Sequence, residues 1–248
     1  MVGLLAVIVL STGALAKVFV SLNGGFYIEY PDQWWQVDYQ TVDYYLQQLQ
    51  ADPDTYDYDA VFSARKLAPF HDYEYLIVTV DTSGEMDRRA RDSVVAELAD
   101  LFGEEVQYRP IQESFAALEV DRPAYDRDRM LFIRLTDVGD EQQGFKKHLY
   151  CLRFYEKGTA HFYFFAPDST FDEYRPQFYD ILMSFSTEDV AQRMPRESVK
   201  LADPEHLQKR DGASGVSKTT VVIPTAAVVI IIIALAARRK RRNQHEKE

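Results

Sequence analysis

The chain has 248 residues, of which 46% are hydrophobic and 27% charged, a composition that excludes a wholly disordered or collagen-like protein. The formal net charge is −11, although residues 238–248 carry six Lys or Arg against two Glu, so the rest of the chain is more acidic still. Such an acidic body argues against a general nucleic-acid binder, because binding phosphates requires Lys and Arg. The single cysteine, Cys151, excludes an intramolecular disulfide and a cysteine-based zinc cage.

The N-terminus reads as a signal peptide over residues 1–16. An apolar run from Leu4 to Leu10 is followed by a small polar break and by Ala14-Leu15-Ala16, which is typical of a cleavage site. We expect cleavage between Ala16 and Lys17. No Lys or Arg precedes the apolar run, so a short uncleaved anchor and a first buried strand remain open as alternatives.

Residues 17–185 form the predicted domain. All of the Phe, Tyr and Trp residues lie between Phe19 and Phe185, mostly in short β-prone runs. Pro31 ends the first of these runs, and a Gly-containing segment at 156–160 has the length of a hairpin connection. The predicted strands are 26–30, 34–38, 60–66, 75–81, 105–110, 115–120, 129–136, 148–155 and 161–166.

Three segments have helical spacing. A weak helix is expected from Val42 to Gln50, and a longer one follows a capping box at Thr82-Ser83-Gly84-Glu85 and stops at Gly103. The last is expected to begin near Glu173, with Pro176 in its first turn, and to end at Phe185. Strands joined by hairpins and helices with one apolar stripe predict an α+β fold, a mainly antiparallel sheet sandwiched by helices.

Two motifs stand at the ends of this domain. The opening Phe26-Tyr27-Ile28-Glu29-Tyr30-Pro31-Asp32-Gln33-Trp34 reads as a strand, then Tyr-Pro, two residues and Trp, and is similar to the entry of PsbP-like domains, the superfamily shared by PsbP and Mog. The closing Phe162-Tyr163-Phe164-Phe165-Ala166-Pro167, with the helix ending in Ser184-Phe185, is similar to its last strand, Ala-Pro turn and final helix. The resemblance covers residues 19–186 in order of elements. It implies an antiparallel sheet between helices and binding or assembly roles, with no shared catalytic residues.

The C-terminal part of the chain reads as a membrane anchor. Residues 186–218 are a polar juxtamembrane linker without any aromatic residue. Residues 219–237 are uncharged and, as a helix, would be about 28 Å long, close to the hydrocarbon thickness of a bilayer. The basic tail 238–248 opens with Arg238, Arg239, Lys240, Arg241 and Arg242 and is expected to stay in the cytoplasm by the positive-inside rule. We therefore predict a single-pass membrane protein with its domain on the periplasmic or extracellular side.

The search for reactive motifs yields little. No G-x-S-x-G or S-x-x-K sequence occurs, and Cys151 lies in an apolar strand, where a buried structural thiol is expected. His148 and His161 open neighbouring predicted strands, so a two-histidine metal site is conceivable beside the plainer interpretation as strand-edge residues. The four aspartates of Asp52–Asp59 form either a solvated acidic loop or a calcium site, and the alternating charges of 121–129 indicate a salt-bridged loop.

The remaining unusual feature is tyrosine in an acidic setting. Tyrosine is enriched where partners bind, although these rings could also simply cover the sheet. We predict a non-enzymatic binding or assembly module, without a catalytic site or cofactor, whose partner is another protein of the envelope. The alternatives are an envelope hydrolase with a hidden pair of carboxylates and a small-ligand-binding domain. The predicted partner surface consists of Tyr39, Tyr44, Tyr56, Tyr58 and Tyr73.

Overall fold

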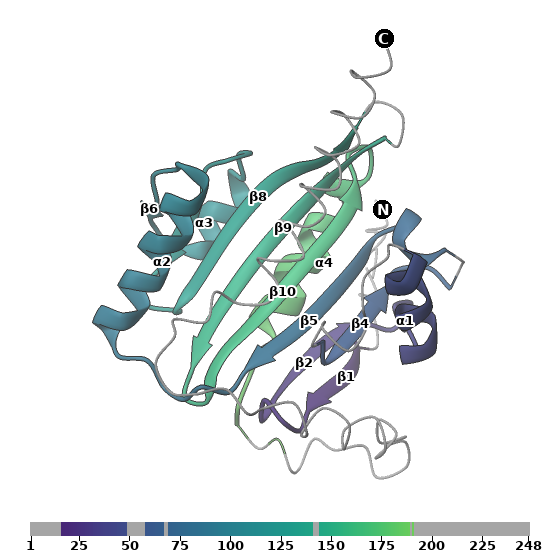
Figure 1. Cartoon of the computed structure of the whole chain (residues 1–248), viewed down its shortest axis with the longest axis horizontal. Helices are drawn as coiled ribbons and strands as arrows, with labels where there is room; N and C mark the ends of the chain where they lie inside the picture. The colour runs from purple at the N-terminus through teal and green to yellow at the C-terminus, as the bar shows by residue number, and fades with distance from the viewer. Residues whose placement is uncertain (1–15, 49–57, 67–68, 141–143, 189, 191–248) are drawn as a thin grey trace, which may run out of the picture.

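The computed structural model of the chain describes residues 16–48, 58–66, 69–140, 144–188 and 190. They form a two-stranded sheet and an eight-stranded sheet, with helices on both faces of the larger one (Figure 1). The predicted α+β class with a mainly antiparallel sheet is therefore confirmed.

The large sheet has the strand order β3-β4-β5-β10-β9-β8-β7-β6. All of its neighbouring strands are antiparallel except the short parallel pair β6 and β7 at one edge. Three long strands, β8, β9 and β10, run side by side through its centre as a meander. The strands are β3 (Trp35–Gln36), β4 (Ala60–Ser63), β5 (Tyr75–Asp81), β6 (Gln107–Tyr108), β7 (Ala124–Asp126), β8 (Leu131–Asp140), β9 (Gly144–Tyr155) and β10 (Gly158–Pro167).

The β9–β10 hairpin fixes the register of this centre. Gly158 has a φ of 144°, and a Cβ added there would lie 2.0 Å from the backbone oxygen of Asp81. Glycine is required at this point because any side chain would collide with the neighbouring strand. The turn at Gly158 therefore places Tyr163 opposite Tyr150 and Phe165 opposite His148.

One face of the sheet is covered by α4 (Phe171–Met183), α3 (Ile111–Ala116) and the hairpin of β1 (Ala16–Ser21) and β2 (Phe26–Pro31). Its core is almost wholly apolar. Phe164 stacks against Phe178 of α4 with ring centroids 4.7 Å apart, and Trp34 lies fully buried over the same helix. We call this the α4 face.

The opposite face carries α1 (Tyr39–Gln48) over the β4 end and α2 (Arg88–Phe102) over the β8 end, as Figure 1 shows. A short 3-10 helix at Phe70–Asp72 packs beside α1, where Tyr45 lies against Phe70. At the other end, Val95 and Leu98 of α2 belong to the same buried cluster as Phe132 of β8. We call this the α1–α2 face.

Several element boundaries differ from those predicted. The capping box at Thr82–Glu85 is not used, because Asp87 caps α2 and accepts a hydrogen bond from the Ala90 backbone N–H at 2.8 Å. The expected stop at Gly103 is confirmed, since this glycine has a φ of 69°.

Two further expectations differ from the structure, and two strands were not predicted. Residues 115–120 are not a strand, since α3 runs from Ile111 to Ala116 and buries Ile111 and Phe115, four residues apart, on one side. The last helix begins at Phe171, two residues earlier than expected. The sequence also gave no separate signal for β1 and β7, which are short and lie at the margins of the aromatic runs.

Part of the predicted architecture lies outside the described residues. This part comprises the signal peptide up to residue 15, nearly all of the linker, the transmembrane segment 219–237 and the tail 238–248. Within the described ranges, none of the helices combines the length and the apolar character that a bilayer crossing needs.

Candidate functional site

A row of polar side chains runs across the middle of the α1–α2 face, on strands that are otherwise rich in apolar residues. Alternate residues of a strand point to opposite faces, so each member is flanked in sequence by residues of the α4 face. All of these side chains are buried. This polar row consists of Thr136 of β8, His148 and Tyr150 of β9, and Thr159, His161 and Tyr163 of β10.

Hydrogen bonds tie the row together. The Tyr150 hydroxyl lies 2.9 Å from Nδ1 of His161, whose Nε2 is 3.0 Å from the Thr159 hydroxyl. Both nitrogens of His161 therefore have partners on neighbouring strands. Across β8 and β9, the Thr136 hydroxyl lies 3.3 Å from Nδ1 of His148.

The rings of the row stand nearly parallel. Tyr163 lies between the two imidazoles, with interplanar angles of 6° to His148 and 4° to His161 and centroid distances of 6.0 and 6.3 Å. His148 also stacks on Phe165 at 4.5 Å. The two histidines are thus on one face but are kept apart by a tyrosine, so the arrangement does not bring them together as a metal pair.

Burial controls the protonation of the row. It lowers the pKa of His148 to about 3, with a further contribution from the positive charge of Arg134, and it lowers the pKa of His161 to about 4. Burial also raises the pKa of Tyr150 and Tyr163. At neutral pH the row is therefore uncharged.

One polar atom of the row is left over. Nε2 of His148 is buried and has no hydrogen-bond partner among the described residues. Buried polar atoms without partners are uncommon in folded proteins, and one at a face bearing other polar groups is a possible ligand contact. Among the histidines of the row, only His148 has a ring nitrogen in this state.

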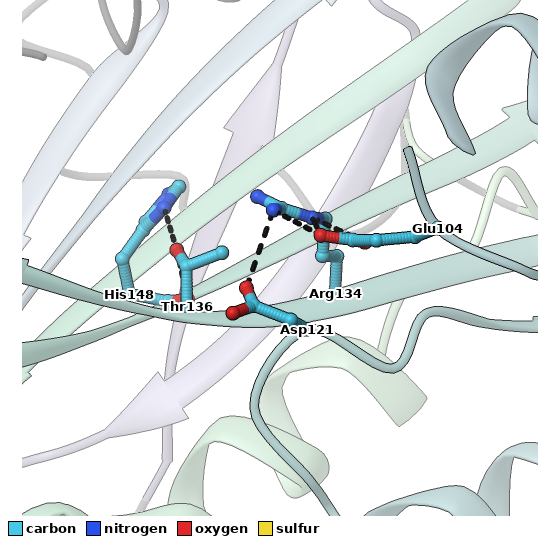
Figure 2. Close-up of polar contacts among 5 residues, drawn as sticks. All are labelled: Glu104, Asp121, Arg134, Thr136 and His148. Carbon is cyan, nitrogen blue, oxygen red and sulfur yellow. Dashed lines mark hydrogen bonds and ion pairs between the residues drawn. The ribbon is translucent and has the colours of Figure 1, made fainter. Parts of the chain in front are cut away.

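A buried ion pair adjoins the row at β8. Nε of Arg134 donates to the two oxygens of Glu104 at 2.8 and 3.0 Å, and a terminal nitrogen of the same guanidinium lies 3.4 Å from Asp121 (Figure 2). The Arg134 and Glu104 side chains are only 10% and 8% exposed, whereas that of Asp121 is 62% exposed. Glu104 follows Gly103, the residue that ends α2, so this pair links the end of the helix to the central sheet.

The groups to consider for nucleophilic or acid–base chemistry are the single thiol and the pairs of carboxylates. The Cys151 thiol is fully buried on the α4 face, where burial raises its pKa well above the usual value, which confirms the expected structural thiol. Two pairs of carboxylates approach one another, Glu104 with Asp121 and Asp137 with Asp168, and each pair is bridged by a cation, Arg134 or Lys147. No cluster of three or more metal-binding side chains occurs in the described part of the chain.

The tyrosines of the predicted partner surface are dispersed. Tyr39 donates to the Asp59 carbonyl and lies against Tyr58, whose hydroxyl donates to Asp43. Tyr58 is only 4% exposed and belongs to the core, because α1 packs on it, so it drops out of that surface. Tyr44 is 63% exposed, and Tyr73 lies half-buried beneath Arg65. Tyr56, with most of the Asp52–Asp59 segment, lies outside the described residues.

The other predicted positions are placed in part. Ala16 and Lys17, at the expected cleavage site, are the first two residues of β1 and pair with Pro31 and Tyr30. The basic cluster from Arg238 to Arg242, which predicts the membrane orientation, is outside the described residues.

The charged segment 121–129 is not simply a salt-bridged loop. Asp126 ends β7 and is buried, and its carboxylate accepts backbone N–H groups from Ile111 at 2.8 Å and from Asp128 and Arg129 at 3.0 Å. The exposed ion pair of Arg127 with Asp92 of α2 is present as well. The alternating charges of this segment did not indicate that the Asp126 carboxylate would accept a hydrogen bond at the start of α3, fifteen residues earlier in the chain.

Sequence comparisons find no matching protein family and no similar curated protein. Among solved structures, the chain is similar to the solution structure of cyanobacterial PsbP (CyanoP) from Synechocystis sp. PCC 6803. The identity is 13% and the TM-score 0.42, over 70% of this chain and 92% of that one. It is also similar to a crystal structure from Bacteroides thetaiotaomicron, with 8% identity and a TM-score of 0.41. That match covers 68% of this chain but 47% of the other, about half its length.

The PsbP-like resemblance stated from the sequence is thus met again among solved structures.

Proposed function

We propose that the chain is an exported, membrane-anchored binding or assembly module rather than an enzyme. In this proposal residues 219–237 span the membrane, 238–248 are cytoplasmic, and the domain stands outside on the linker 186–218. Apolar segments at both ends of the chain and the basic cluster that follows the second one support this topology.

The observation that carries the binding role is a set of exposed aromatic side chains. Tyr44 of α1 and Trp35 of β3, which lie towards the same edge of the large sheet, are 63% and 36% exposed, and Tyr108 of β6, at the opposite edge, is 51% exposed. Tyr and Trp are enriched at the centres of protein interfaces, where they bury a large apolar area without losing many rotamers. The polar row, in contrast, is buried, and its histidines are neutral at physiological pH.

The topology is tested by adding protease to intact cells and identifying the released fragment by mass spectrometry. We expect cleavage within 186–218 and a mature N-terminus at Lys17. Retention of Met1, or complete protection of the domain where the outer face is accessible, would contradict the proposal.

The binding role is tested by crosslinking the full chain in intact cells and purifying it through its membrane anchor. One partner in stoichiometric amount is expected. An enzymatic role would gain support if nothing were captured under conditions that preserve a known membrane complex.

Small-ligand binding is a second candidate, favoured by Nε2 of His148. A ligand that bonds this atom would shift the ¹⁵N resonance of the His148 ring and leave His161, whose nitrogens are both engaged, unchanged. Equal shifts of both rings would speak against a specific contact.

A further inference from the structure

A tyrosine and a histidine share a buried hydrogen bond at the centre of the polar row. The Tyr150 hydroxyl lies 2.9 Å from Nδ1 of His161, a distance at which a proton can pass from one atom to the other. The two residues come from the neighbouring strands β9 and β10 and are only 7% and 2% exposed. Water therefore competes little for this hydrogen bond.

The state of the imidazole suits it to accept the phenol proton. A neutral histidine that accepts at Nδ1 carries its own proton on Nε2, where the Thr159 hydroxyl lies 3.0 Å away as a partner. Burial lowers the pKa of His161 to about 4 and raises the pKa of Tyr150. At rest the proton therefore stays on the phenol, and an unprotonated base is held against it.

We propose that Tyr150 and His161 form a one-electron redox site. An oxidant takes one electron from the Tyr150 ring and is itself reduced, the phenol O–H bond breaks, and the proton forms an N–H bond at Nδ1 of His161. The products are a neutral phenoxyl radical and an imidazolium. Return of one electron, together with the same proton, restores the starting pair.

The base distinguishes Tyr150 from other buried tyrosines. An oxidised phenol is a strong acid, so a tyrosine loses an electron far more easily where a neighbouring group takes its proton. Tyr155 donates to the Gly24 carbonyl at 3.0 Å, and the Tyr163 hydroxyl bonds to that of Thr79. A carbonyl and a hydroxyl do not take up a proton at neutral pH, whereas an imidazole does.

Tyr58 is the closest rival, since its hydroxyl donates to the Asp43 carboxylate at 2.9 Å. Asp43 is half-buried on α1, so a proton received there can pass on to water. At His161 the proton remains inside the core, beside the oxygen that released it. Oxidation of Tyr150 is therefore the more readily reversed of the two.

Contacts between aromatic rings lead from Tyr150 to the surface at α1. The first is the stack of Tyr150 on Tyr163, with ring centroids 5.2 Å apart. Successive centroids along the path are 4.5–6.0 Å apart, and its last ring is half-buried. From Tyr163 the path continues through His148, Phe165, Tyr75 and Phe70 to Tyr45.

The burial of the pair determines which class of oxidant can act on it. A reagent that transfers an atom must touch the phenol, which the core prevents, whereas an electron can cross a series of short gaps between rings. The substrate class is therefore an outer-sphere one-electron oxidant, such as an oxidised dye or metal complex at the surface. This activity goes beyond the proposed binding role and requires neither the anchor nor the partner.

Flash oxidation of the full chain in detergent micelles tests the proposal. Photogenerated tris(bipyridine)ruthenium(III), which is too large to enter the core, serves as the oxidant, and electron paramagnetic resonance detects the radical. We expect a tyrosyl radical that outlasts the signals of exposed rings. Its spectrum should show a coupling to the proton held by His161, and this coupling should disappear after exchange into deuterated water.

Variants assign the radical to the pair. Tyr150→Phe removes only the hydroxyl and should lose the long-lived signal. His161→Gln keeps a side chain that can hydrogen-bond but cannot take up the proton, so it should lose the signal too, which a merely structural hydrogen bond would not cause. Tyr155→Phe is the matched control, because this buried tyrosine lies on the same strand, and its signal should be unchanged. Urea unfolding checks that each variant is folded.

Three results would overturn the proposal. A long-lived radical that persists in Tyr150→Phe would show that another ring holds it, and its loss in Tyr58→Phe would assign it to the pair of Tyr58 with Asp43. A radical in the unaltered chain that decays as fast as those of exposed rings would show that the site does not retain its proton. So would a radical without the exchangeable coupling, a result that depends on no variant.

Discussion

The two faces of the central sheet are built from the same three strands with opposite chemistry. On the α4 face, Phe162 and Phe164 of β10 pack against aromatic residues of the C-terminal part of the domain. The residues between and beside them, His161 and Tyr163, point to the α1–α2 face and hydrogen-bond or stack with neighbouring strands. A period of two residues thus separates an almost wholly apolar core from a buried polar network within one strand.

The difference has an energetic consequence. Apolar burial on the α4 face does not depend on pH, whereas the α1–α2 face contains imidazoles that are neutral when folded and would be protonated below about pH 6.5 when exposed. This face also contains the buried ion pair of Glu104 and Arg134, and removing either partner would leave the other charge buried without compensation. Four changes test this contrast.

The largest effect of a single substitution is expected on the α4 face. Phe178→Ala removes a fully buried ring that contacts Phe164, Trp34 and Phe171. The free energy of unfolding should fall by about 3–5 kcal/mol, equally at pH 7 and pH 5. Urea unfolding at both values measures it, and a loss that differs strongly between them would break the contrast.

The second change breaks the ion pair of the α1–α2 face. Glu104→Ala leaves the Arg134 guanidinium buried without its main partner, and should cost about 3 kcal/mol in the free energy of unfolding. Asp121→Asn is the matched control, because this exposed carboxylate contacts the same guanidinium, and its removal should cost less than about 1 kcal/mol. Equal losses in the two variants would mean that the burial of Glu104 does not increase the contribution of its ion pair to the free energy of unfolding.

The third change is of pH. The folded pKa values of His148 and His161, about 3 and about 4, lie below that of an exposed imidazole, so the unfolded chain binds protons first as the pH falls. Stability is fully present above about pH 6.5 and is lost towards pH 4, at up to ~1.4 kcal/mol per pH unit for each histidine. His161→Gln should make the dependence of stability on pH shallower. An NMR titration in which either folded imidazole is protonated near pH 6.5 would contradict the prediction.

The smallest change concerns the start of α2, the helix that closes the α1–α2 face. Asp87→Ala removes the bond to the Ala90 N–H and should cost about 1 kcal/mol. Glu85→Ala, which would disrupt the capping box suggested by the sequence, should cost a few tenths of that or less. The reverse order in thermal unfolding would place the cap at Thr82 after all.

Much of the fold follows from local patterns. Runs of aromatic and β-branched residues indicate the strands around 26–30, 75–81, 148–155 and 161–166. A clear apolar stripe indicates the last helix. The helix α3 was missed because Phe115 to Val120 is β-prone, whereas the helix begins after Pro110, where the Ile111 N–H donates to the carboxylate of the distant Asp126. Short elements depend on such tertiary contacts more than on propensity.

The candidate site was predictable only in outline. The sequence shows His148 and His161 on adjacent strands, but which groups they meet depends on register, and register is set by the turn at Gly158. The pairing of Glu104 with Arg134 joins residues thirty apart and has no local signal. Exposure of Tyr44 and burial of Tyr58 likewise depend on how α1 packs, since both have the same acidic surroundings in the sequence.

The central claim, that an anchored domain binds a partner through exposed aromatic residues, is tested most directly by site-specific photocrosslinking in intact cells. A photoreactive group replaces Tyr44, which is 63% exposed, or, as a control, Tyr58, which is 4% exposed and lies on the same side of the sheet. We predict one stoichiometric crosslinked protein from position 44 and none from position 58. The absence of any adduct at position 44, with the protein folded and in the membrane, would contradict the claim for this surface.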